Sequence, residues 1–203
     1  MPLTRLPLTT GVSGTLPIAN GGTNVTTAAD LANTGNLVLL STATASDDAT
    51  VNFDNTVITS SYNDYVMIGT GVRPATDVCT PRIAPSTDNG SNFTNSDTGR
   101  NWIKTTGAAG GFERATGNYI EMGFSLGNDA DLGGSFRCDF YNLNVSGMYK
   151  WGICDYVAKH SADAYKWDGG YSINTTSAIN YLRFEFSTGN IAEGEFRFYG
   201  VKT

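Results

Sequence analysis

The chain has 203 residues, a length that fits one domain with a short additional segment. Its net charge of −6 argues against a nucleic-acid-binding surface, which needs clustered Lys and Arg, and its 40% of hydrophobic residues argue against a disordered chain. No apolar run approaches the roughly 18 residues of a membrane-spanning helix. Charged residues make up only 16% of the chain, while Thr, Ser, Asn and 24 glycines are abundant, as is typical of strands joined by tight turns.

We expect residues 1–35 to form an extended N-terminal arm. Pro2, Pro7 and Pro17 recur in it, and proline fixes φ and lacks a backbone donor, so the segment suits neither a sheet nor a long helix. Residues 27–32 are its one helical candidate. The arm has too few apolar residues to fold alone, so it should lie against a partner chain or against the following domain. It also lacks the apolar core of a secretory signal peptide, which favours folding in a cytoplasm.

From about residue 36, apolar side chains recur at every second position, as in strands with one buried face. This alternation predicts strands at 37–44, 50–58, 62–73, 79–85, 100–106, 119–126, 135–145, 150–157 and 164–173, and two more around Phe184 and Phe196. Turn-forming Gly, Asn and Asp residues separate them. We therefore expect an all-β domain over residues 36–203, an antiparallel β-sandwich of the jelly-roll type.

The last two strands are expected to form a closing hairpin. Register arguments place Phe184 opposite Phe198 and Phe186 opposite Phe196, with all four rings facing the core.

Residues 14–24, with the sequence GTLPIANGGTN, resemble the GTLPVANGGTG element of tail-fibre and other virion proteins of tailed bacteriophages. The run from Ile179 to Lys202 is similar to the closing hairpin of a jelly-roll module in such proteins. The resemblance implies a structural virion protein that forms a homotrimer and is made in the bacterial cytoplasm. It assigns docking onto other phage proteins of the tail or capsid to the matching arm residues: Leu16, Pro17, Ile18, Asn20, Gly21 and Gly22.

Two kinds of virion protein agree with this resemblance. The first is a fibre or spike that docks by its arm and binds a glycan on the host surface. The alternative is a capsid decoration or head-fibre protein without a defined receptor, favoured by the short length of the expected arm. A third reading is an enzyme that trims surface polysaccharide. Neither nucleic-acid binding nor membrane insertion is expected.

Aromatic residues near the middle of the chain suggest where a glycan would bind. Tyr165 and Trp167 share one face of the expected strand at 164–173, beside Asp168 and two glycines. An aromatic ring packs on the C–H face of a pyranose while polar groups bind its hydroxyls. The competing interpretation is that Trp167 belongs to the core, and for Trp151 we expect a core position outright.

Three cysteines, Cys79, Cys138 and Cys154, fit no zinc-binding spacing. We expect Cys138 and Cys154 to be reduced and buried as small hydrophobic side chains in their strands.

The sequence predicts no catalytic residue, metal site or cofactor. His160 is the single histidine, no G-x-S-x-G elbow accompanies it, and it is expected in an exposed loop. Asp88, Asp129 and Asp131 are calcium-ligand candidates whose spacing fits ordinary turns better. A glycosidase would need two facing carboxylates in a cleft, and the candidates are Glu113, Glu121, Asp139 and Asp155.

Overall fold

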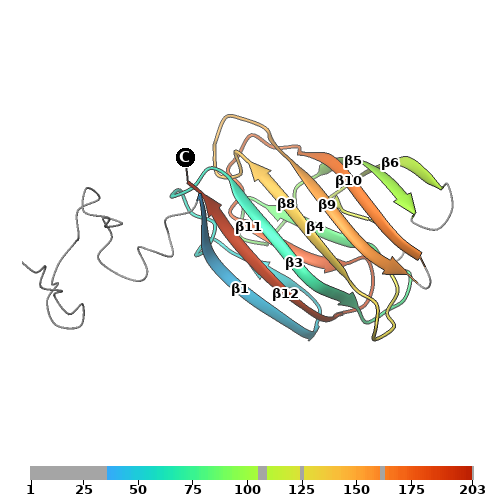
Figure 1. Cartoon of the computed structure of the whole chain (residues 1–203). Coiled ribbons are helices and arrows are strands. Elements are labelled where there is room, and N and C mark those ends of the chain that lie inside the picture. The colour runs from blue at the N-terminus through green and yellow to red at the C-terminus, as the bar shows by residue number, and fades with distance from the viewer. Residues whose placement is uncertain (1–35, 105–108, 124–125, 161–162, 203) are drawn as a thin grey trace, which may run out of the picture. The chain divides into compact units, whose positions relative to one another are not determined.

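The computed structural model describes residues 36–104, 109–123, 126–160 and 163–202. The chain divides into two compact units, Met1–Val38 and Leu39–Thr203, and the description below concerns the second. The described residues contain strands and no helix, and they form two antiparallel sheets packed as a sandwich (Figure 1). The prediction of an all-β antiparallel sandwich is therefore confirmed.

The larger sheet has eight strands in the order β1-β12-β3-β8-β9-β10-β5-β6, and the smaller sheet has four in the order β2-β11-β4-β7 (Figure 1). The strands are β1 Leu37–Asp48, β2 Val51–Phe53, β3 Tyr65–Pro74, β4 Pro81–Ser86, β5 Ser96–Lys104, β6 Gly110–Gly117, β7 Ile120–Glu121, β8 Gly134–Tyr141, β9 Lys150–His160, β10 Asp163–Ile173, β11 Tyr181–Phe186 and β12 Ile191–Val201.

Aromatic rings from both sheets meet in the core. Phe136 of β8 stacks on Phe184 of β11 with ring centroids 5.4 Å apart, and Phe53 of β2 stacks on Phe198 of β12 at 4.7 Å. Each of these rings is almost fully buried. The two-residue alternation of the strands places these rings on the inner faces, so the core follows directly from the hydrophobic pattern.

The predicted closing hairpin is wrong. Strand β11 lies in the small sheet between β2 and β4, whereas β12 lies in the large sheet between β1 and β3. Phe184 and Phe196 are nevertheless both buried, and their centroids lie 4.8 Å apart across the core instead of in one ladder. The alternation identifies which face of a strand is buried, but not which strand lies beside it. Phe184 and Phe196 are buried equally well when they face each other from different sheets.

The strand predictions at 50–58 and 119–126 need correction, and one strand was not predicted. Of the first run, Val51–Phe53 alone forms a strand, β2. In the described part of the run at 119–126, β7 covers Ile120–Glu121 and Leu126 forms an isolated bridge with Cys79. Gly123 packs closely against core rings, since a Cβ there would lie 3.0 Å from Tyr156 and 3.1 Å from Trp167. Strand β6 was not predicted, because its sequence GGFERATG has no apolar alternation. It pairs with β5 as the last strand of the large sheet.

The expectation of two reduced cysteines is also wrong. Cys138 of β8 and Cys154 of β9 lie directly opposite each other in the ladder and form a disulfide, with Cα atoms 4.2 Å apart. The sequence predicted that both side chains are buried, but only the register of β8 against β9 brings them face to face. The remaining cysteine, Cys79, is buried and is not part of a disulfide. Burial raises the pKa of its thiol to about 11.

Candidate functional site

The outer face of the large sheet, which points away from the small sheet, carries a group of exposed apolar side chains. Six large ones are between 36% and 63% exposed: Ile103, Phe112, Tyr141, Trp151, Ile153 and Val157. They lie on β5, β6, β8 and β9, at positions that alternate with buried residues such as Tyr156. Grouped apolar side chains of this kind mark a contact surface on a folded protein.

A shallow hollow, here called the glycine trough, opens in the middle of this face. It has a volume of about 350 Å³, and its lining is Gly99, Asn101, Ile153, Cys154, Asp155, Asp168, Gly169 and Gly170. Gly170 of β10 pairs with Gly99 of β5 on one side and with Ile153 of β9 on the other. Gly170 carries no side chain, so the backbone of the sheet forms the floor of the trough at this position.

Gly170 leaves open space above the sheet. A Cβ added there would meet a single atom within 4 Å, the carbonyl oxygen of Gly152, at an ordinary contact distance of 3.7 Å. Packing of the sheet therefore does not require glycine at position 170, and the space above it is open to a ligand.

The rim of the trough is polar. Asp155 of β9 lies directly opposite Asp168 of β10, and Asn101 of β5 lies on the other side of Asp168. Lys166 places its Nζ 3.3 Å from Asp168 Oδ1 and 3.7 Å from Asp155 Oδ1. Arg137 of β8 lies directly opposite Asp155, and Arg114 of β6 lies directly opposite Gly99. The rim therefore offers hydrogen-bond acceptors and carries charges of both signs.

Exposed apolar side chains lie near the trough, and of these Ile153 belongs to its lining. On one side, Ile153 is 46% exposed and Trp151, two residues before it on the same face, is 44% exposed. On the other side, the Phe112 ring is 63% exposed and lies over Gly99, where a Cβ would come within 3.3 Å of Phe112 Cζ. Aromatic side chains on opposite sides of a polar floor suit a ligand with both apolar and hydroxylated surfaces.

The predicted platform of Tyr165 and Trp167 does not form at the surface. The two residues do share a face of β10, and their rings stack at 5.3 Å, but this is the inner face and Trp167 is only 1% exposed. On that face Trp167 packs against Tyr156, with ring centroids 5.5 Å apart, and against the backbone at Gly123. Asp168 points the opposite way and belongs to the rim of the trough.

The prediction of a core position for Trp151 is wrong as well. Its neighbour Lys150 occupies the inward position and is only 1% exposed. The Lys150 ammonium is satisfied by donating to the carbonyl oxygens of Val145, Met148 and Thr176. Burial lowers the pKa of Lys150. A buried lysine on a strand was unexpected, and it forces the larger Trp151 to the outside.

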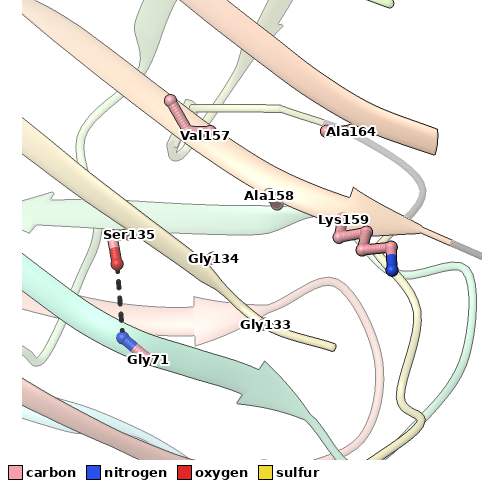
Figure 2. A pocket seen from close by; sticks show the side chains of 8 residues that line it. All are labelled: Gly71, Gly133, Gly134, Ser135, Val157, Ala158, Lys159 and Ala164. Atoms are coloured by element: carbon pink, nitrogen blue, oxygen red, sulfur yellow. Dashed lines mark hydrogen bonds between the residues drawn. The ribbon is translucent and has the colours of Figure 1, made fainter. Parts of the chain in front are cut away.

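A second hollow of about 340 Å³ lies where β8 begins and β9 ends (Figure 2). Most of its lining is glycine, alanine or valine, and its polar side chains are Ser135 and Lys159. The Ser135 hydroxyl accepts a hydrogen bond from the backbone N–H of Gly71, at 3.4 Å, as Figure 2 shows. With few polar groups, this hollow offers less chemistry than the glycine trough.

Three of the four carboxylates considered for glycoside hydrolysis are held in ion pairs with arginine. Glu113 and Glu121 both accept from the Arg100 guanidinium, at 2.9 and 3.0 Å, and Glu121 also accepts from Arg82 at 2.9 Å. Asp139 forms a two-point ion pair with its neighbour on β8, Arg137. These contacts join strands of both sheets.

The remaining candidates lie at the ends of strands. His160 is the last residue of β9, not a loop residue, and its Nε2 is 3.7 Å from an Asp77 carboxylate oxygen. Asp129 belongs to a turn in which its carbonyl accepts from the N–H of Leu132, and Asp88 accepts from Ser86 and Asn92. In the described part of the chain, no three His, Cys, Asp or Glu residues are grouped to hold a metal ion. The proposed docking residues Leu16 to Gly22 lie outside the described residues.

These features define an antiparallel β-sandwich with a polar trough and exposed apolar side chains on its broad outer face. Comparison with protein-family models, curated proteins and solved structures found no match for the chain. Within the described ranges, no helix is long and apolar enough to cross a membrane.

Proposed function

We propose that this chain is a structural protein of a tailed-phage particle, and that its sandwich contacts the surface of the host cell. The similarity of residues 14–24 to the virion element supports the first part. The outer face of the large sheet supports the proposed contact with the host cell. Trp151, Ile153 and Phe112 are exposed there, near a polar trough.

Residues 1–35 attach the sandwich to the particle in this proposal, and three copies associate into one fibre or spike. Three copies multiply weak contacts, because linked sites raise the overall affinity without new interactions. Light scattering on the purified full chain tests this assembly. A mass near three times 21.6 kDa is expected, and a monomer at micromolar concentration would contradict it.

The location of the protein separates the two virion roles. Gold-labelled antibodies against the purified chain should mark the tails of particles from cells that encode it. Labelling spread over the capsid would favour the decoration role instead. Particles that contain the chain in neither place would contradict the virion proposal.

A further inference from the structure

We infer that copies of the chain join head to tail, each placing the aromatic end of its large sheet in the hollow of the next copy. The aromatic end is the group Tyr141, Met148, Tyr149 and Trp151, where β8 ends and β9 begins. The hollow is the one of Figure 2, where β8 begins and β9 ends. This inference rests on the proposed assembly of three copies and names the two surfaces that meet in it.

The aromatic end has the composition of a protein contact. Its four side chains are between 36% and 57% exposed, and Tyr141 lies directly opposite Trp151 in the β8–β9 ladder. No charged residue occurs from residue 140 to residue 149. Trp, Tyr and Met are enriched in protein interfaces, and charged residues are depleted at interface centres. The aromatic end is therefore suited to burial against another protein surface.

The hollow is a pocket of matching size and chemistry. Its volume of about 340 Å³ has room for the ring of a large aromatic side chain. Glycine, alanine and valine make up most of its lining, and none of the lining residues is acidic. Lys159 also lines the hollow (Figure 2), and an ammonium group is attracted to the face of a Trp or Tyr ring. Strong interfaces commonly place an aromatic residue in a pocket of this kind.

The two surfaces lie at opposite ends of the same strands. Trp151 is the second residue of β9, whereas Val157 and Lys159 of the hollow are near the end of β9. Six strand residues span about 20 Å, so Trp151 does not reach the hollow of its own chain. Each copy therefore carries both halves of a head-to-tail contact. Contacts of this type form a closed ring when the rotation between copies closes, and three copies are the ring that the proposed function requires.

The charged middle of the outer face favours this end-to-end contact over two large sheets packed squarely together. Arg137 and Asp155 lie opposite each other there, and Arg114 lies opposite Gly99. Square packing would bury these charges at the centre of the interface, where charged residues are depleted. The end-to-end contact leaves them in water. It also leaves the glycine trough and Phe112 uncovered, so that side of the face remains available to the host surface.

Sedimentation of the purified full chain and its variants tests the inference. Trp151→Ala removes the side chain that enters the hollow. Gly133→Leu fills the hollow, and the nearest atom to a Cβ at Gly133, the Val72 carbonyl oxygen, would be 3.7 Å away. Each change should weaken the association of copies at least tenfold. The matched controls Phe112→Ala and Gly170→Leu change the same outer face outside the contact and should leave association unchanged.

Trimers of unchanged affinity in both Trp151→Ala and Gly133→Leu would overturn the inference and leave the proposed three-copy assembly standing. A monomeric wild-type chain would contradict both. The two results are therefore distinguishable.

Photocrosslinking gives a second readout if a variant misfolds. The photoreactive residue p-benzoylphenylalanine, incorporated at position 151, keeps an aromatic ring there. Irradiation of the assembled protein should join two chains, and mass spectrometry should place the link at residues 133–135 or 157–159 of the other copy. Links to other parts of the second copy, or a trimer without links, would show that position 151 does not lie in the hollow.

Discussion

Removing the Cys138–Cys154 disulfide should destabilise the sandwich by about 3 kcal/mol. The bond joins residues separated by 16 positions in sequence. In the chain-entropy description, closing a loop of about 16 residues removes roughly 10 cal/mol/K from the unfolded chain, or about 3 kcal/mol at 25 °C. Domains of this size are commonly stable by only about 5–15 kcal/mol, so the change is a large fraction of the total.

Urea unfolding and thermal unfolding, both followed by tryptophan fluorescence, measure this effect. The oxidised protein is compared with the same protein in a strong reductant, because reduction removes the bond and keeps both sulfur atoms in place. We expect a thermal midpoint lower by roughly 6–12 °C in the reduced form, at about 2–4 °C for each kcal/mol in a domain of this length. The Cys138→Ala/Cys154→Ala variant should unfold at least as easily.

Equal urea midpoints for the oxidised and reduced proteins would refute the reasoning. They would mean either that the bond does not form or that the unfolded chain already keeps β8 and β9 together. Mass measurement after alkylation separates these outcomes, because a protein with the bond takes up one alkyl group under denaturing conditions, on Cys79, and a protein without it takes up three.

Three further predictions follow from single side chains. Phe184→Ala should cost about 3–5 kcal/mol in urea unfolding, because Phe184 is fully buried against Phe136 and Phe196, and a cost below 1 kcal/mol would contradict its central place in the core. Hydrogen bonds from Asn92 and Ser86 lower the pKa of Asp88 from 3.8 to about 2, so the stability that it contributes is present above pH 4 and is lost as the pH falls through 2. Asp88→Asn should therefore lose less stability than the wild type between pH 4 and pH 2, and identical losses would show that Asp88 does not contribute. Burial raises the pKa of Cys79 to about 11, so a thiol reagent at pH 8 should modify it only after unfolding, and rapid modification of the native protein would contradict its burial.

The sequence by itself determined the fold class and much of the core. The two-residue alternation of Phe184, Phe196 and Phe198 is a local property, and it predicted their burial because side chains on successive strand positions must point to opposite faces. The abundance of Gly, Thr, Ser and Asn predicted strands joined by tight turns, because Thr favours strands and Gly, Ser and Asn favour turns.

Only the tertiary structure decided which strands are neighbours and which face of each strand is covered. Alternation could not tell that β11 and β12 enter different sheets, or that Cys138 lies opposite Cys154, because both depend on pairing between separate segments. It also could not assign Trp167 to the inside and Trp151 to the outside, since each strand has two faces and a buried Lys150 reversed the expected choice. The glycine trough combines residues from β5, β9 and β10 that lie up to about 70 positions apart, and an absent side chain becomes a floor only when neighbouring strands leave the same place empty.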